Sequence, residues 1–358
     1  MNDSSLKVFV LGAGCSRDCG YPLASEIPQQ LREFAAALDS TRAPRLIRCV
    51  NDTLALMSRT VDTFDTLVQK IDAGHYDDTD AFIGEEMIRK HQLRSQRVQA
   101  AKLAISALFH FKEAAAFDTG LKRYRDFLGD LFPVAGSEWN GMDAHTCCVL
   151  TFNYDRVFEI AFQDRFNVDL QQWGLYGGRV LNAGLDMWYN RRVEFTENRF
   201  SFLKLHGSIG MWADDDHGDT RHHYLLPEAG HNFTPTDDYY FAESADGPKP
   251  MRLKAQPLLV FPHERQRALD QQQGDFSQHY LQQVWARAAQ LMSQAAEVSI
   301  VGYSFASIDR ESFLNLLGNA KACKRIVVQN PDAVEICGRL EMRHPDWKGK
   351  LTPCEFKF

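Results

Sequence analysis

An apolar run that leads directly into glycines, close to the start of the chain, constrains the fold most. Residues 8–11 read Val-Phe-Val-Leu, which is typical of a buried strand, and Gly12-Ala13-Gly14 follows at once. Glycines here let the backbone turn tightly and approach a ligand where a Cβ would clash. The next helix would direct its N-terminal amides to the same place, which favours a diphosphate. The stretch therefore predicts the start of a nucleotide-binding α/β domain, although a tight turn without a ligand has the same pattern.

The residues just after this turn narrow the class of nucleotide-binding domain. Arg17 stands where the dehydrogenase fingerprint G-x-G-x-x-G has its third glycine, which packs the helix onto the strand. The substitution weakens the prediction of a dehydrogenase. Arg17 could pair with a phosphate or be a solvated surface charge. Cys15 and Cys19 could have lowered thiol pKa values near a helix N-terminus, but structural thiols are the simpler interpretation.

The overall composition argues against several classes of protein. The chain has 358 residues and a net charge of -7 at pH 7, which disfavours a dedicated nucleic-acid binder. Its eight cysteines form no C-x-x-C pair, its first residues do not resemble a signal peptide, and no apolar run has the length of a membrane span. We therefore expect a cytoplasmic protein with reduced thiols that binds neither membranes nor nucleic acid directly.

A long helical segment separates the first predicted strand from the second. Residues 85–119 contain no proline or glycine, and their apolar side chains recur at helical spacing; residues 51–71 behave similarly. This is more helix than one crossover between strands needs. The sequence therefore predicts a large helical insertion lobe over residues 28–144.

Further apolar runs, each followed by glycine or polar residues, predict the rest of a sheet. The expected strands are residues 6–14, 147–152, 202–205, 258–261, 298–301 and 325–329, and the expected helices between them are residues 156–163, 280–296 and 310–317. Alternating strands and helices predict an α/β fold with a Rossmann-like, doubly wound parallel sheet. The expected core comprises residues 1–27, 145–210 and 255–358, and residues 211–254 form a polar excursion.

Polar side chains mark the carboxyl ends of these predicted strands. They are Ser16, Asn153, Asp155, His206, Ser304 and Asn330. Since open α/β sheets bind ligands in the crevice at that edge, the group predicts a binding site. Taken singly, Asn153 or Asp155 could cap the following helix, and His206 could be an ordinary turn residue.

Five short motifs resemble, in order, those of the sirtuin family. They are G-A-G-C-S at 12–16 with G-Y-P at 20–22, T-F-N-Y-D at 151–155, H-G at 206–207, G-Y-S at 302–304 and the asparagine at 330. The resemblance covers the predicted core and not the helical lobe. It implies that the dinucleotide is NAD. The residues that it places at the NAD site are Gly12, Ala13, Gly14, Ser16, Asp155, Gly302, Ser304 and Asn330.

This sequence departs from the sirtuin pattern in the segments that would bind zinc and the acyl-lysine peptide. Residues 207–301 contain no cysteine, so the four-cysteine zinc ribbon of the deacylases is missing and no zinc is expected. Residues 258–263 lack the Gly-Glu that helps clamp an acyl-lysine peptide, and residues 23–27 lack the Phe-Arg that follows the glycine turn. This combination is similar to the sirtuin-like NADases of bacterial anti-phage defence. The resemblance implies NAD hydrolysis by a regulated effector, a homo-oligomer or one partnered by a HerA-type ATPase or a short Argonaute.

The chemistry of nicotinamide release suits two of these residues. Nicotinamide leaves as a neutral molecule, so the protein has to hold the ribose and position a water rather than supply a strong nucleophile. The Asn153 amide suits that positioning, and His206 suits a general base near neutral pH. Ser16, Gly14 and Ser304 are expected at phosphate or ribose oxygens, and Asn330 at the adenine-side ribose. Asp155 could support the ribose or the nicotinamide amide, or could cap its helix.

Three other interpretations of the sequence remain open. The chain could be an NAD-dependent protein deacylase, which the missing ribbon and clamp disfavour. It could be a non-catalytic sensor of NAD or ADP-ribose, which the presence of both Asn153 and His206 disfavours. The run Asp214-Asp215-Asp216-His217 with His222-His223 could hold a metal, but consecutive ligands in a polar loop make a poor cage.

Overall fold

The structure is a computed structural model of the chain. It describes residues 6–58, 64–77, 85–119, 121–132, 147–166, 200–214, 221–224, 234–241, 256–261, 276–305 and 310–356. None of the helices in these ranges is long and apolar enough to span a membrane.

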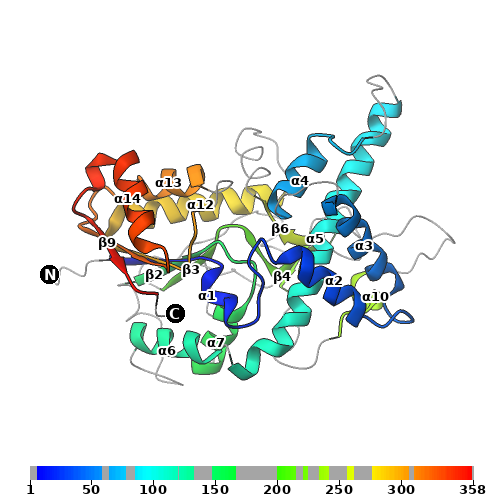
Figure 1. Cartoon of the computed structure of the whole chain (residues 1–358), viewed down its shortest axis with the longest axis horizontal. Coiled ribbons are helices and arrows are strands. Elements are labelled where there is room, and N and C mark those ends of the chain that lie inside the picture. The colour runs from blue at the N-terminus through cyan, green and yellow to red at the C-terminus, as the bar shows by residue number, and fades with distance from the viewer. Residues whose placement is uncertain are drawn as a thin grey trace. The chain divides into compact units, whose positions relative to one another are not determined.

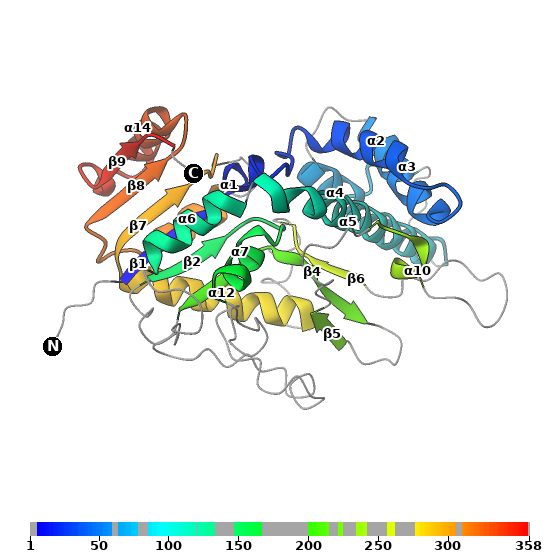
Figure 2. The same cartoon turned by 90° about the horizontal axis from the view of Figure 1, so that it is seen from below.

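A six-stranded sheet forms the core, and all of its strands run parallel (Figures 1 and 2). The strands are β1 (Leu6–Leu11), β2 (Cys147–Thr151), β3 (Ser201–Lys204), β7 (Ala295–Val301), β8 (Arg325–Gln329) and β9 (Leu351–Cys354). Their spatial order is β3-β2-β1-β7-β8-β9. Counted along the chain this is 3-2-1-4-5-6, the order of a Rossmann dinucleotide-binding sheet, whose direction of winding reverses between β1 and β7. The predicted fold class is confirmed.

Helices cover both faces of this sheet. On one face lie α6 (Leu121–Leu131) and α7 (Val157–Phe166), and on the other lie α12 (Phe276–Gln294) and α13 (Arg310–Leu317) (Figure 1). The helix α14 (Ala333–Arg343) and a short 3-10 turn (Pro345–Trp347) connect β8 to β9. Aromatic contacts join the first pair to the sheet: Phe158 stacks on Phe202 at 4.3 Å between centroids. All five side chains of β2 are buried, as expected for a strand covered on both faces.

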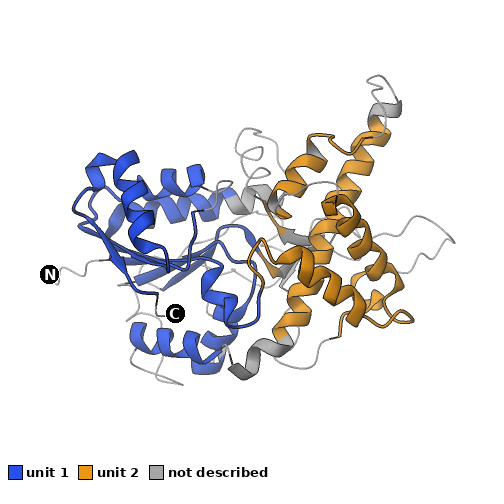
Figure 3. Cartoon of the chain, in the orientation of Figure 1, with its two compact units in different colours: residues 1–21, 116–207, 265–358 blue, residues 22–115, 208–264 orange. Residues whose placement is uncertain are grey.

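The chain divides into two compact units (Figure 3). The first comprises residues 1–21, 116–207 and 265–358, and the second comprises residues 22–115 and 208–264. The first unit contains the parallel sheet and its covering helices. The second contains most of the predicted helical lobe together with the described part of the polar excursion. The domain boundaries drawn from the sequence stay a prediction.

The second unit is built around one long helix. Its elements are α2 (Ile27–Ala37), α3 (Pro44–Ser58), α4 (Phe64–Asp72), most of α5 (Glu85–Thr119), α10 (Asp237–Tyr240) and the three-stranded sheet β5-β4-β6, formed by β5 (Arg221–Tyr224), β4 (Gly207–Asp214) and β6 (Gln256–Leu259). The middle of α5 is buried on all sides, from Leu103 to His110. The Asp237 carboxylate accepts hydrogen bonds from the backbone N–H groups of Arg45 and Leu46 at 2.9 Å each, and so satisfies the first turn of α3.

Two features of the sheet differ from the sequence prediction. The apolar run at residues 258–261 was expected beside the parallel strands, but β6 belongs to the three-stranded sheet of the second unit. An apolar run shows that a strand is buried without showing which strand it pairs with. The sequence also gave no expectation for β9, which ends the parallel sheet and contains Pro353. Proline is tolerated there because an edge strand leaves one row of N–H groups unpaired.

Candidate functional site

Two glycine turns meet where the winding of the sheet reverses. The backbone N–H of Gly12 donates to the Val301 carbonyl at 2.9 Å, and that of Gly14 donates to the Gly302 carbonyl at 2.9 Å. The turn after β1 is therefore bonded directly to the turn after β7. This places both predicted glycine motifs at the edge where sheets of this order bind dinucleotides.

The mutual packing of these turns already requires glycine, and the close approach of a ligand that the sequence suggested stays a prediction. A Cβ on Gly12 would lie 2.5 Å from the Cα of Tyr303, and one on Gly14 would lie 2.8 Å from the Gly302 carbonyl oxygen. Gly302 has a φ of +62°, and a Cβ there would lie 2.7 Å from the Cys15 nitrogen. These neighbours are backbone atoms, which cannot rotate away.

The helix expected after the first glycine turn is a single turn, α1 (Gly14–Arg17). Its first amides are already used: besides the Gly14 bond, the N–H of Cys15 donates to Gly12 and that of Ser16 donates to Ala13. The expected row of free N-terminal amides for a diphosphate is therefore absent from this turn, because the chain bonds them itself. The exposed positions of the two turns are Ala13 and Ser304, so a ligand at this edge reaches those residues first.

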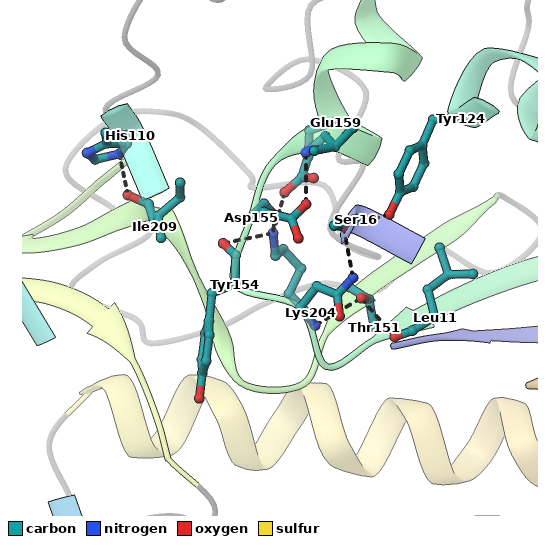
Figure 4. A network of polar contacts seen from close by, with 12 residues as sticks. Leu11, Ser16, His110, Tyr124, Thr151, Tyr154, Asp155, Glu159, Lys204 and Ile209 are labelled. Carbon is teal, nitrogen blue, oxygen red and sulfur yellow. Dashed lines mark hydrogen bonds and ion pairs between the residues drawn. The ribbon is translucent and has the colours of Figure 1, made fainter. Parts of the chain in front are cut away.

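Ser16 is the centre of a buried hydrogen-bond network that also contains Tyr124, Asn153 and Asp155, called the Ser16 network here. Figure 4 labels Ser16, Tyr124 and Asp155. The Asn153 Nδ2 donates to the Ser16 Oγ at 3.2 Å, and the Tyr124 hydroxyl lies 2.9 Å from the same oxygen. Ser16 also hydrogen-bonds with the Asp155 carboxyl. The hydroxyl donates to the carboxylate and accepts from the other two, which uses all of its capacity. Ser16 therefore supports Asn153 in this structure, and its predicted contact with phosphate or ribose stays a prediction.

The hydrogen-bond partners of the Asn153 side chain define the orientation of its amide. Its two amide hydrogens go to the Gly12 carbonyl at 3.0 Å and to the Ser16 Oγ. The amide oxygen Oδ1 is buried and has no hydrogen-bond partner within the described residues. A buried acceptor without a donor is costly, and such groups point to a ligand or a water. Asn153 can therefore receive a hydrogen bond from a water or a sugar hydroxyl, but it cannot donate one.

Asp155 takes the capping role that the sequence left open. Its Oδ1 accepts the backbone N–H of Val157 at 3.1 Å, at the start of α7. Burial raises the pKa of the Asp155 carboxyl above its ordinary value, and the Lys204 ammonium only partly offsets that rise. A ligand contact by Asp155 stays a prediction.

This raised pKa predicts how the stability of an Asp155→Asn variant depends on pH. In the wild type the unfolded chain ionises this carboxyl from about pH 4 upward, before the folded protein does. Ionisation therefore favours the unfolded state progressively as pH rises through the folded pKa. Asparagine keeps the acceptor for Val157 and carries no charge. We expect the Tm of the variant minus that of the wild type to grow from about pH 4 to about pH 7. A difference that is constant or shrinks over this range would contradict the assignment.

His206 lies in an aromatic cluster beside the Ser16 network. Its ring packs edge-on against Phe152 at 5.1 Å between centroids and lies 5.9 Å from the ring of Tyr154. Thr151 pairs with Lys204 in the parallel ladder, so Asn153 and His206 each follow their strand by two residues at the same level. The structure thus brings both residues to one edge of the sheet. The Asn153 amide faces Ser16, whereas the His206 ring contacts the residues on either side of Asn153 in sequence.

Asn330 connects the turns after β7 and β8. Its Nδ2 donates to the Tyr303 carbonyl at 3.2 Å, and its Oδ1 accepts the backbone N–H of Asp332 at 2.9 Å. The side chain therefore holds the start of α14 against the turn after β7. Its predicted contact with the adenine-side ribose stays a prediction.

Burial raises the pKa of both thiols near the glycine turn. It raises the pKa of Cys15 well above its ordinary value and that of Cys19 to about 12. The Cys15 thiol donates to the Val301 carbonyl at 3.2 Å. The raised pKa values contradict the possibility of lowered ones and favour the interpretation of structural thiols.

The structure holds no group of three or more His, Cys, Asp or Glu side chains with the arrangement of a metal site among the residues it describes. Of the metal candidates, Asp215, Asp216 and His217 lie outside the described residues, and Asp214, His222 and His223 are described only as backbone positions of β4 and β5.

The residues that the sequence missed are Tyr124, Glu159 and Lys204. Tyr124 comes from α6, and nothing in the local sequence relates that helix to the glycine turn. Lys204 carried a detectable signal, since a charged side chain within an apolar strand requires a buried partner. Glu159 is that partner, with its Oε1 2.8 Å from the lysine Nζ.

No protein-family model and no curated protein matches the sequence of this chain. Among solved structures, it is similar to a mutant Sir2 homologue in complex with ADP-ribose, at 11% identity and a TM-score of 0.38 over 91% of this chain and 82% of that chain. It is also similar to Sir2Tm bound to a propionylated peptide, at 12% identity and a TM-score of 0.35 over 95% of this chain and 93% of that chain. Identities and TM-scores this low assign no activity to this chain. A proposal of its function therefore has to be argued from its sequence and from the geometry of the site.

Proposed function

We propose that this chain is a dinucleotide-binding enzyme whose site lies at the carboxyl edge of the parallel sheet, where the turns after β1 and β7 meet. The strand order and the meeting of two glycine turns support dinucleotide binding. The observation that carries the proposal is the buried Asn153 Oδ1, an acceptor left open at this edge within the described residues. It suits a water or a ribose hydroxyl.

The dinucleotide in this proposal is NAD, and the reaction is hydrolysis of its nicotinamide–ribose bond. The electron pair of that bond leaves with the pyridine nitrogen, which makes nicotinamide neutral. The oxygen of a water adds to the ribose carbon and loses a proton to His206, giving ADP-ribose. Asn153 orients the water or the ribose by accepting a hydrogen bond, and His206 acts as the general base. The motif order of the sequence supports NAD over other dinucleotides.

The proposal extends to a regulated effector in anti-phage defence. An unregulated NADase would deplete NAD in its own cell, so we expect control through a homo-oligomer or through a partner such as a HerA-type ATPase or a short Argonaute. The support for this part is the resemblance of the sequence to defence NADases that lack the zinc ribbon.

Product analysis tests the proposal directly. The purified chain is incubated with NAD, alone and with each candidate partner, and the products are separated by liquid chromatography. Equimolar nicotinamide and ADP-ribose are the expected products. Release of acyl-ADP-ribose in the presence of an acyl-lysine peptide would instead indicate a deacylase. Tight NAD binding without nicotinamide release under every condition would indicate a sensor.

An Asn153→Ala variant makes this experiment specific to the site. Loss of the orienting acceptor is expected to lower the rate of nicotinamide release by about tenfold or more, since misplaced reactants react slowly. Circular dichroism and thermal unfolding check that the variant is folded. A folded variant with the wild-type rate would place the reaction elsewhere.

A further inference from the structure

A fully buried lysine connects the loop that carries Asn153 to the strand that leads to His206. Lys204 is the last residue of β3 and is 2% exposed. Its Nζ donates to the Glu159 Oε1 at 2.8 Å, to the Tyr154 carbonyl at 3.4 Å and to the Asp155 carbonyl (Figure 4). An ammonium has three hydrogens, and all three are used here by the chain itself. Lys204 is therefore not available as a nucleophile or as a phosphate ligand.

Two of the three partners of this ammonium belong to the loop that carries Asn153. Tyr154 and Asp155 follow Asn153 directly, and Lys204 precedes His206 by two residues on the neighbouring strand. One charged group thus ties the loop after β2 to the strand that leads to His206. The two carbonyls it binds are the first after the proposed water-orienting amide.

The energetics of a buried ion pair make stability a weak reason for this arrangement. Glu159 lies on α7 and is 1% exposed, and burial raises the pKa of its carboxyl although the Lys204 ammonium lowers it. Removing two charges from water costs several kcal/mol per ion, so a buried pair is often no more stable than apolar residues of similar volume. Such a pair provides directed bonds that an apolar pair cannot provide.

We propose that Lys204, with Glu159 as its counter-ion, is a positioning residue that holds the Asn153 loop in register with His206. The inference rests on the proposed function. Without the ammonium, the carbonyls of Tyr154 and Asp155 lose their donor, and the loop can shift relative to β3. Because misplacement by about 1 Å can cost about a hundredfold in rate, even a small shift would slow the reaction.

The test is a Lys204→Met/Glu159→Met double variant, which replaces both charged groups by apolar side chains with volumes close to those of the wild type. We expect a Tm near that of the wild type, since replacement of both partners is often neutral. We expect kcat for nicotinamide release to fall by about tenfold or more, while KM for NAD changes by less than about threefold. A merely structural pair would lower the Tm and leave the kcat of the folded fraction unchanged.

Hydrogen exchange gives a second readout that does not depend on activity. Amides of residues 152–158 are expected to exchange faster in the double variant, while those of β1 stay protected. A Lys102→Met variant, which alters a half-buried lysine of α5 in the second unit, is the matched control and is expected to leave both readouts unchanged.

The outcomes separate this inference from the proposed function. Unchanged exchange of residues 152–158, or an unchanged kcat in a folded double variant, would overturn the positioning role of Lys204. Absence of nicotinamide release by the wild type would overturn the proposed function, while the exchange experiment would still decide whether Lys204 holds the loop.

Discussion

Replacement of His206 by alanine is expected to lower the rate of nicotinamide release by about a hundredfold or more, because a positioned general base contributes about 10²–10⁴-fold. The imidazole lies at the end of β3, level with the end of β2 from which Asn153 extends. Its removal leaves the water or the ribose hydroxyl without a base to receive a proton. The rate is measured from nicotinamide formed under saturating NAD, by chromatography.

The controls for His206 separate chemistry from folding and binding. His344→Ala removes a histidine that stacks on Trp347 at 4.1 Å, at the end of α14, and should leave the rate unchanged. NAD affinity of the His206 variant, measured by calorimetry, should change far less than its rate. A folded His206→Ala variant that keeps more than about a third of the wild-type rate would show that this imidazole is not the base.

The second large effect concerns the fold: Gly12→Ala is expected to lower the free energy of unfolding by about 3 kcal/mol or more. The new Cβ would lie 2.5 Å from the Tyr303 Cα and 2.6 Å from the Gly302 carbonyl oxygen. Relief requires the turns after β1 and β7 to separate, which breaks the bond from the Gly12 N–H to the Val301 carbonyl. Urea unfolding followed by circular dichroism measures the loss.

The matched control is another glycine-to-alanine substitution in the same unit. Gly338 lies within α14, and a Cβ there would meet no atom within 4 Å. Alanine has the higher helix propensity, so Gly338→Ala is expected to stabilise the protein by about 0.5–1 kcal/mol. If both substitutions changed stability equally, the close packing of the two glycine turns would be contradicted.

The sequence was sufficient to predict those helices and strands whose pattern lies within a few consecutive residues. The helix over residues 85–119 was predicted with the bounds of α5, because a long stretch without proline or glycine and with helical apolar spacing has few other ways to fold. The strands β1, β2, β7 and β8 were predicted for a similar reason, since each is a short apolar run that ends at a turn signal. Their alternation with helices was enough to predict a parallel sheet.

Local patterns did not predict which strands pair with one another or which distant side chains come into contact. The strand β6 is apolar like the parallel strands, and its three-stranded sheet was invisible because partners are chosen by distant residues. The same holds for Tyr124, whose contact with Ser16 spans 108 residues of sequence.

The sequence by itself determined the positions at which the chain turns and the polar residues that follow each strand, because turn conformation and burial depend on neighbouring residues. Only the tertiary structure decided what those residues touch. The glycines lie at the contact between two turns. The amide hydrogens of Asn153 bond to Gly12 and Ser16, and the Lys204 ammonium bonds to the carbonyls that follow Asn153. Hydrogen bonds and close contacts between distant segments exist only once the strands are placed side by side, so no local pattern encodes them.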